Sequence, residues 1–502
     1  MADMTTSPHA STRAAHRAAP ANRAQQAAHA TTTDAAAPSL WAGASAAPAE
    51  PELPDTAPTG AIRDSLYDLI PLSPLEHDLL ATSAFGRLQG VKQLGFVYRV
   101  WPGATHTRFE HSLGVYYLML RGLRALLATR HAAGPTGAAA QSISVDPTDL
   151  RSLLAAALLH DIGHYPFSHA IEELGQPITP HERVGRDIVE GSEVATTLER
   201  HGLDPARVAN LIDPPKDTAL PASDALLVRL LSGPLDVDKL DYLPRDARAC
   251  NVPYGGVDVS RLLGAMRVIA PSATDDAPRL GVSDKGISPL NSLLHARQEM
   301  FDNVYWHHTN RAMMVMLLRA TQEALLAGAV TPAALPTHDD ASLLAFLSGA
   351  DMPAATRALV GALRQRQPYK TALEVSAQAG KVYQLLDTLF WDQAKRRRVE
   401  IALAAALGEA LGEPVAEYEV LVDIPKPEKW EMETLVAFSA PPLGMRPLMT
   451  WTEATGQRAE DLGVYERRQR RIRIVCHPRW RDRVRAEGQA ALLGVIERIP
   501  AL

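Results

Sequence analysis

The segment from Asp146 to His160 constrains the fold most strongly, because it carries the complete pattern of a buried helix. Asp146 can cap the first turn, Pro147 suits the first helical position, and Asp149 places a negative charge near the N-terminus. The apolar residues that follow have the i, i+3, i+4 spacing of a buried face: Leu150, Leu153, Leu154, Ala157 and Leu158. The helix runs directly into His160, and a mainly α fold is expected.

Helical patterns continue through most of the chain. A helix is expected from about Ser223 to Gly233, and the charged segment 236–248 that follows contains Pro244, which should kink or end a helix. A long helix is expected over about 291–326, and its methionines and leucines are expected to pack in the core.

The period of the pattern changes near residue 412. Apolar residues alternate over 418–424, before two prolines, and again over 472–476. Alternation with a period of two is typical of strands. The sequence therefore predicts a helical core followed by a smaller C-terminal α/β region.

The N-terminal segment is rich in Ala, Pro, Thr and Ser and almost lacks large apolar residues. Such a segment cannot offset the entropy of ordering, so we expect a disordered tail, and we favour this over an organellar transit peptide. The expected divisions are a tail at 1–60, a helical core at 61–330, a helical extension at 331–411 and a small α/β region at 412–502.

Composition excludes several classes of protein. With 51 Lys and Arg against 57 Asp and Glu, the net charge of −6 gives no general attraction to nucleic acid or to anionic membranes. The two cysteines, Cys250 and Cys476, lie far apart and form no CxxC pair, which argues against a disulfide scaffold or a Cys-ligated zinc. No stretch reaches the apolar length of a membrane span. We therefore expect a soluble, cytoplasmic protein.

Three segments carry potential metal ligands. His160-Asp161 offers adjacent nitrogen and oxygen ligands at a helix end, His111 follows Arg108 by three residues, and Asp238 lies in the segment DVDKLDY. Taken singly, each is more often a satisfied core residue or part of a solvated helix face. Their combined order, histidine, His-Asp and then aspartate, is not expected by coincidence.

The segments HTRFEHSLGVYYL, LLHDIGHYPFSH and DVDKLDYLPRDA resemble the HD superfamily of metal-dependent phosphohydrolases, in particular its deoxynucleoside triphosphate triphosphohydrolases (dGTPase-like). The likeness covers about 65–320, so the core at 61–330 would be an HD phosphohydrolase core. The resemblance implies one divalent metal ion, of the set Mn, Fe, Zn, Ni or Mg, held by His111, His160, Asp161 and Asp238.

The resemblance also assigns roles to other residues. It implies that the reacting phosphate is surrounded by His164, His169 and His181, with Glu172 as an orienting carboxylate. Phosphate oxygens would be held by Arg108, Lys239 and Arg297. Sugar and base would be surrounded by Gln93, Leu94, Tyr242, Asp246 and Tyr305. The implied reaction is attack of water on the α-phosphorus, which releases a nucleoside and inorganic triphosphate.

The segment 81–89 differs from its counterpart in relatives that guanine nucleotides activate. Relatives activated by guanine nucleotides resemble DTPQFQRLR where this chain has ATSAFGRLQ, with Ala81 and Gln89 replacing Asp and Arg, so we expect constitutive activity or another effector. Two alternatives to this function remain. One is an HD phosphohydrolase for a monophosphate, cyclic nucleotide or alarmone, and the other is a module that binds nucleotides or nucleic acid through the basic runs 395–398 and 467–473. The resemblance further implies a homo-oligomer, a dimer or tetramer.

Overall fold

The structure is a computed structural model that describes residues 58–128, 146–215, 222–233, 235–269, 278–428, 434–457 and 459–501. All of them belong to one compact unit. The described part is mainly helical with small sheets, as the sequence predicted. Most of the expected disordered tail, residues 1–57, lies outside the described residues.

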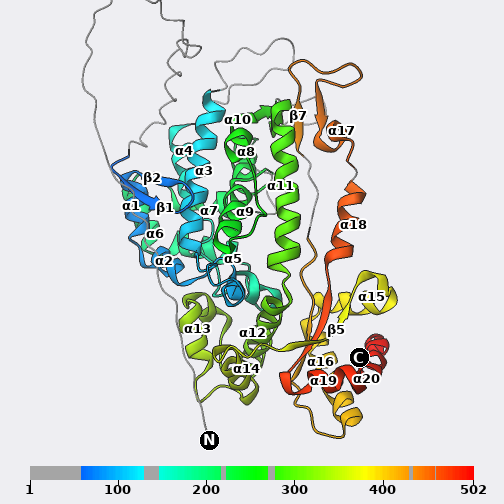
Figure 1. Cartoon of the computed structure of the whole chain (residues 1–502). Helices are drawn as coiled ribbons and strands as arrows, with labels where there is room; N and C mark the ends of the chain where they lie inside the picture. Colours follow the sequence, from blue (N-terminus) through cyan, green and yellow to red (C-terminus); the bar gives the residue numbers. More distant parts are fainter. Residues whose placement is uncertain are drawn as a thin grey trace, which may run out of the picture. The chain divides into compact units, whose positions relative to one another are not determined.

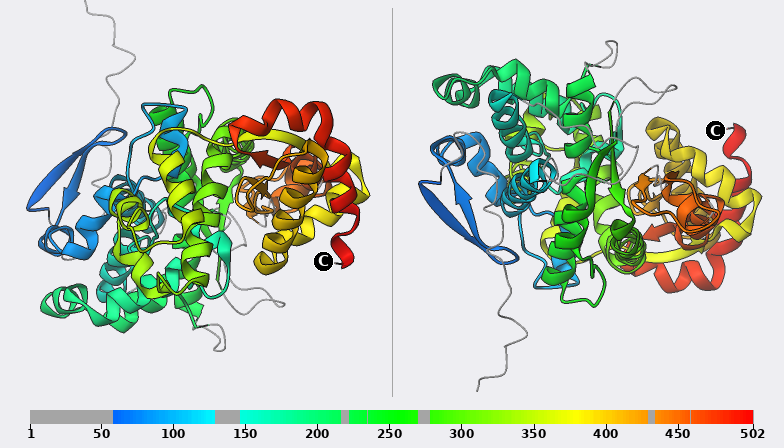
Figure 2. Two further views of the ribbon diagram at one scale, coloured as in Figure 1. Left: turned by 90° about the horizontal axis from the view of Figure 1, so that it is seen from below. Right: turned by 90° about the horizontal axis from the view of Figure 1, so that it is seen from above.

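Four helices that run side by side form the centre of the core (Figure 1): α3 (Arg108–Ala128), α4 (Pro147–Leu159), α9 (Val237–Cys250) and α11 (Ile287–Met300). The other helices of this half are α1 (Pro74–Leu80), α2 (Ser83–Gly86), α5 (His181–Gly191), α6 (Glu193–Arg200), α7 (Pro205–Ile212), α8 (Ala222–Leu231) and α10 (Val259–Ala265). An antiparallel hairpin of β1 (Gly60–Asp64) and β2 (Asp68–Leu72) lies at the edge of this core (Figure 2).

Helix α4 forms as predicted. The Asp146 side chain accepts a hydrogen bond from the Thr148 amide, and Pro147 occupies the first turn. The apolar face of α4 is buried, and the helix ends at Leu159 with His160 as its C-cap. The first residue of the His-Asp pair is therefore held at the end of a helix that is fixed in the core.

Pro244 was expected to kink or end a helix, and it does not end one, because α9 continues to Cys250. Proline removes only its own amide from the helix, and the side chains of Leu240, Leu243 and Ala247 around it are buried in the main core. Packing on both sides of Pro244 therefore outweighs the lost hydrogen bond.

The single long helix expected over 291–326 is in fact two helices. Helix α11 ends at Met300, a π-helical turn covers Phe301–Tyr305, and α12 begins at His308 and ends at Leu326. The side chain of His307 accepts a hydrogen bond from the Thr309 amide and so caps α12. An apolar periodicity that continues across the break hid it from sequence analysis.

After residue 330, the described part of the chain contains the two predicted strands and three others that were missed. An antiparallel sheet has the order β5-β9-β6, from Lys370–Val375, Ile472–Cys476 and Val420–Asp423. Strand β5 lies inside the segment that was expected to be helical only. A second sheet, β3-β4-β7-β8, comprises Met266–Ile269, Arg279–Ser283, Leu435–Ala437 and Leu448–Thr450. The helices here are α13 (Asp340–Leu347), α14 (Ala354–Arg364), α15 (Lys381–Asp387), α16 (Gln393–Leu411), α17 (Trp451–Thr455), α18 (Ala459–Gln469), α19 (Arg481–Arg483) and α20 (Gln489–Glu497).

Three hydrophobic clusters support these parts. One fills the helical core, one joins α12 to α13 and α14, and one lies between α16, α20 and the β5-β9-β6 sheet. Both cysteines are buried and free. Among the described residues, no helix has the length and apolar character that crossing a membrane requires. The domain boundaries, the cytoplasmic location and the homo-oligomeric state stay predictions.

Candidate metal centre and adjacent histidine group

The four predicted metal ligands lie together in the helical core. His111 comes from α3, His160 and Asp161 directly follow α4, and Asp238 lies in the first turn of α9. The Nε2 atom of His111 is 3.0 Å from Asp238 Oδ1 and 3.5 Å from Asp161 Oδ2. The Nε2 atom of His160 is 3.4 Å from Asp161 Oδ1 and 3.9 Å from Asp238 Oδ1. Helix packing thus brings together residues that are far apart in the chain.

The hydrogen bonds of both imidazoles leave one nitrogen of each ring for a cation. His111 Nδ1 lies 2.8 Å from Asp241 Oδ2, and His160 Nδ1 lies 2.9 Å from the carbonyl oxygen of Ala157. Because these oxygens only accept hydrogen bonds, both Nδ1 atoms carry a proton. Both Nε2 atoms are buried and have no hydrogen-bond partner among the described residues. Two imidazole nitrogens that face two carboxylates fit a divalent cation.

The charge around His111 points to the same conclusion. Burial disfavours a positive ring, but the carboxylates of Asp238, Asp241 and Asp161 outweigh it and raise the pKa of His111 to about 10. A buried ring beside three carboxylates takes up a proton when no other cation neutralises them. A divalent ion would replace that proton.

Sequence analysis did not assign a role to Asp241, which orients His111. Arg245 donates from Nε to Asp241 Oδ2 at 2.8 Å and from Nη1 to Asp64 Oδ2 at 2.8 Å. All of these side chains are buried. The hairpin residue Asp64 is therefore connected through Arg245 and Asp241 to His111, a predicted metal ligand. The i, i+3 spacing of Asp238 and Asp241 was the only sequence signal for this arrangement.

The predicted catalytic residues form a second group, which contacts Asp161. His164 Nε2 lies 3.2 Å from Asp161 Oδ1, and the His164 ring stacks on that of His181 with 3.8 Å between centroids. The two oxygens of Glu172 lie 2.8 Å from His169 Nδ1 and 2.9 Å from His181 Nδ1. The His164 side chain is fully buried, whereas that of His169 is 60% exposed. The group therefore extends from the buried ligands to solvent.

Burial and charge give the members of this group different protonation. Burial, with Arg108 and His181 nearby, holds the pKa of His164 well below its usual value, so this ring is neutral. Burial also acts against a charged His181, but Glu172 outweighs it and raises the pKa of His181. The two histidines that Glu172 contacts overcome its burial and lower its own pKa. The group thus holds a carboxylate, a ring that favours a proton and a neutral ring.

Arg108 lies between the two groups. Its Nη1 donates to Asp161 Oδ2 at 2.6 Å, and its Nε donates to Ser168 Oγ at 3.1 Å. Arg108 and Asp161 are both buried, and this contact, after the opposing effect of burial, holds the pKa of Asp161 well below its usual value. Arg108 therefore keeps Asp161 ionised beside the other predicted ligands.

The other two predicted phosphate cations already have protein partners. Lys239 Nζ lies 2.6 Å from Asp236 Oδ2, and Arg297 Nη2 lies 2.8 Å from Glu428 Oε2. An incoming phosphate would have to compete with these carboxylates. The structure therefore leaves the roles of Lys239 and Arg297 as predictions.

Three of the predicted sugar and base residues, Tyr242, Asp246 and Tyr305, form a chain of contacts. Tyr305 donates from its hydroxyl to Asp246 Oδ2 at 2.7 Å, and the rings of Tyr242 and Tyr305 lie 6.5 Å apart in an edge-to-face arrangement. His106, which sequence analysis did not assign, places Nε2 2.7 Å from Asp246 Oδ1. The position of His106 two residues before Arg108 was the one indirect sign of it in the sequence.

Gln93 links this arrangement to the partner of Arg108, since its amide donates a hydrogen bond to the carbonyl oxygen of His106 at 3.0 Å. The backbone oxygen of Gln93 lies 3.0 Å from Ser168 Oγ, and its buried Oε1 has no hydrogen-bond partner among the described residues. Leu94 is partly buried against the main core. Gln93 therefore has an acceptor that remains for a ligand.

The basic runs are largely engaged within the protein. Arg396 donates to the carbonyl of Val422, and the other pairs are Arg397 with Glu323, Arg470 with Asp387 and Arg473 with Glu374. The guanidinium groups of Arg396, Arg470 and Arg473 belong to buried residues. These contacts explain much of both runs as structural and weaken the nucleic-acid reading.

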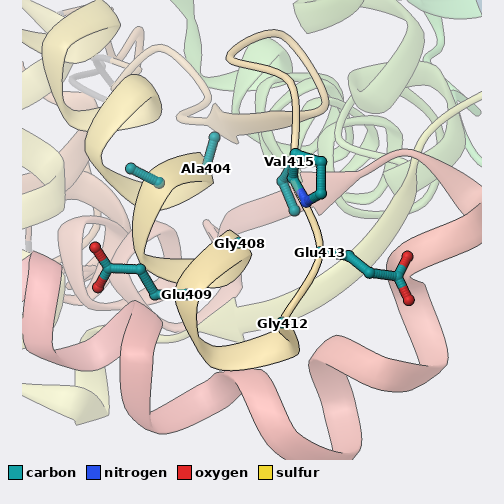
Figure 3. Close-up of a pocket in the computed structure, with 8 residues that line it drawn as sticks. Ala404, Gly408, Glu409, Gly412, Glu413 and Val415 are labelled. Carbon is teal, nitrogen blue, oxygen red and sulfur yellow. The ribbon is translucent and has the colours of Figure 1, made fainter.

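A shallow pocket lies at the C-terminal end of α16 (Figure 3). None of its lining residues is a predicted site residue, and they are Ala404, Ala405, Gly408, Glu409, Gly412, Glu413, Pro414 and Val415. Glu409 and Glu413 point to opposite sides in Figure 3. The pocket does not gather polar groups toward one ligand.

Known proteins share both parts of this chain. The HD domain family matches residues 108–222, and the HD associated region matches residues 257–478. A crystal structure of a hypothetical protein from Aquifex aeolicus has the same fold, with a TM-score of 0.61 and 24% identity over 85% of this chain and 99% of that chain. The first match contains three of the four converging ligands, His111, His160 and Asp161.

Curated relatives match in sequence as well. An uncharacterized protein of Methanocaldococcus jannaschii is 32% identical over 57% of this chain and 54% of its own length. The human deoxynucleoside triphosphate triphosphohydrolase SAMHD1 is 28% identical over 52% of this chain and 44% of its own length. The chain thus spans about half the length of the curated relatives it matches. This chain therefore contains an HD domain over residues 108–222 and an HD associated region over residues 257–478.

Proposed function

We propose that this protein is a metal-dependent hydrolase of nucleoside triphosphates, in particular deoxynucleoside triphosphates, that releases nucleoside and inorganic triphosphate. The observation that carries the proposal is the convergence of His111, His160, Asp161 and Asp238 beside a second group of three histidines and a glutamate. The likeness to SAMHD1, named as a deoxynucleoside triphosphate triphosphohydrolase, supports the choice of substrate class.

Phosphate ester hydrolysis needs a polarised phosphoryl group, an activated water and a protonated leaving oxygen. A divalent cation held by the four ligands would supply Lewis acidity and lower the pKa of water. His181, which Glu172 biases toward the protonated form, is suited to donate a proton to the leaving oxygen. Arg108, fixed by Asp161 and Ser168, is placed to stabilise negative charge that develops on phosphate.

The sugar would meet the cluster around Asp246. The hydroxyl of Tyr305 and the ring of His106 hold this buried carboxylate in place, so it can accept a hydrogen bond from a sugar hydroxyl. The ring of Tyr242 nearby would restrict the space around the sugar, as deoxy selectivity requires.

The test is to incubate the full chain with each of the eight common ribo- and deoxyribonucleoside triphosphates, with Mn or Mg, and to separate the products by chromatography. The proposal predicts nucleoside and inorganic triphosphate in one step, without added GTP, and no products from the Asp238→Asn variant. Stepwise release of orthophosphate would contradict it. Hydrolysis confined to monophosphates, cyclic nucleotides or alarmones, run as parallel substrates, would establish the rival function.

A further inference from the structure

A carboxylate from the HD associated region reaches the loop that carries the catalytic histidines. Asp340, the first residue of α13, accepts hydrogen bonds from the Phe167 amide at 2.7 Å and from the Lys92 amide at 3.1 Å. The residue is 5% exposed. Burial raises its pKa to about 6, and the two amide bonds offset only part of this rise, so Asp340 is ionised at neutral pH and able to accept both bonds.

A second contact holds the same segments together. Arg87 donates from Nη1 to the carbonyl of His338 at 3.0 Å and from Nη2 to the carbonyl of Ile162 at 2.8 Å. Residues 338–340 are therefore bonded both to the segment 87–92 and to the loop 162–167. These contacts join parts of the chain separated by 75 to 251 residues.

The loop that Asp340 holds has an uncommon backbone. Phe167 and Ser168 have φ values of 60° and 59°, in the left-handed region that side chains other than glycine rarely adopt. Such residues persist only where the surroundings fix them. Here the Phe167 amide is bound by Asp340, and the Phe167 ring stacks on Phe96 with 4.3 Å between centroids.

This left-handed turn lies between two of the proposed catalytic histidines, His164 and His169. It also directs the Ser168 hydroxyl toward the Nε atom of Arg108, at 3.1 Å. If the turn relaxed to right-handed backbone, His169 and the partner of Arg108 would both move. The placement of two proposed active-site groups, His169 and Arg108, thus depends on one turn.

We propose that Asp340 is a positioning residue, which fixes the turn at Phe167 and Ser168 from the HD associated region and so keeps the catalytic groups in place. The inference rests on the proposed function for its effect on hydrolysis. Asp340 is not needed to cap its own helix, because Asp339 does so by accepting a hydrogen bond from the Ser342 amide at 2.7 Å. Asp339 therefore offers a matched control.

The test compares Asp340→Asn, Asp340→Ala and the control Asp339→Ala in the full chain. Misplaced catalytic groups typically cost up to about 100-fold in rate. We expect kcat to fall about 10-fold for Asn, which keeps one acceptor, and about 100-fold for Ala. KM and the affinity for Mn, measured by electron paramagnetic resonance, should change by less than about threefold. Asp339→Ala should lower Tm and leave kcat within about twofold.

Hydrogen–deuterium exchange of peptides that cover 162–169 provides a readout independent of activity. We expect faster exchange in both Asp340 variants and unchanged exchange in Asp339→Ala. Folded Asp340 variants with normal kcat and normal exchange would overturn the inference, and so would equal losses of kcat and Mn affinity, which indicate a general structural role. If the wild type hydrolyses no nucleotide, the proposed function fails. The role of Asp340 in fixing the turn would be rejected separately, by unchanged exchange of peptides 162–169 in the Asp340 variants.

Discussion

Replacing Asp241 by asparagine tests whether the orientation of a ligand, and not only its presence, sets metal affinity. Asp241 accepts the proton of His111 Nδ1 at 2.8 Å and two hydrogen bonds from Arg245 at 2.8 and 3.0 Å. An asparagine can turn its amide toward His111, which favours the tautomer with the proton on Nε2, the nitrogen that faces the other ligands. Loss of such an orienting partner typically costs about 10- to 100-fold in metal affinity, or about 1.4–2.7 kcal/mol.

The Asp64→Asn variant is the matched control. Both substitutions leave Arg245, whose side chain is 2% exposed, with one carboxylate in place of two. Breaking a buried pair costs about 3–5 kcal/mol, and both variants should lie near the lower value because one partner remains. Asp64 does not contact His111, so its substitution should leave metal affinity within about threefold.

The measurement is calorimetric titration of the metal-free variants with Mn or Zn, with the free energy of unfolding followed by denaturant. Equal losses of metal affinity in Asp241→Asn and Asp64→Asn would refute the reasoning, since they would attribute the effect to stability alone. So would full affinity in Asp241→Asn.

Other substitutions test separate parts of the structure. Gly114→Ala should lower metal affinity and Tm, because a Cβ atom there would lie 1.9 Å from Asp241 Oδ1. Unchanged metal affinity in a calorimetric titration would contradict this and show that α9 moves freely. Glu172→Gln should reduce Tm most between about pH 4.5 and 6.5. The lowered pKa of Glu172 stabilises the folded protein above the pKa that Glu172 has when unfolded. The raised pKa of His181 stabilises the folded protein fully only below the unfolded pKa of His181, and this contribution is lost as pH rises through the folded pKa. A deficit in Tm independent of pH would contradict this. Glu400→Gln should lower the free energy of unfolding by about 3 kcal/mol, because the buried Glu400 carboxylate accepts a hydrogen bond from Arg319 at 2.6 Å. Denaturant titration measures this change, and a value below about 1 kcal/mol would refute the prediction.

Sequence patterns predicted the features that local physics controls. The cap, first-turn proline and apolar spacing of α4 placed His160 at a helix end, and the alternation over 472–476 predicted β9. Where tertiary packing decided the outcome, the predictions failed. Pro244 did not end α9 because buried neighbours support the helix on both sides, and β5 was missed because its partner β9 lies about a hundred residues later in the chain.

The candidate site likewise contains residues that sequence patterns predicted and residues that they did not. The convergence of His111, His160, Asp161 and Asp238 was predictable because their residue types and order point to one kind of chemistry. Asp241, His106 and Asp340 were not, since each acts through a contact with a residue 130 to 248 positions away, which no local spacing reveals. The predicted roles of Lys239 and Arg297 rest on charge, and the structure shows carboxylates beside both.

We propose that the two groups of side chains direct water to the α-phosphorus of a nucleoside triphosphate. The decisive experiment is hydrolysis of a deoxynucleoside triphosphate in ¹⁸O-labelled water, followed by ³¹P nuclear magnetic resonance and mass spectrometry of the nucleoside. We predict one ¹⁸O atom on a terminal phosphorus of inorganic triphosphate and an unlabelled nucleoside. Label in orthophosphate beside a nucleoside diphosphate, or in the nucleoside, would contradict the claim.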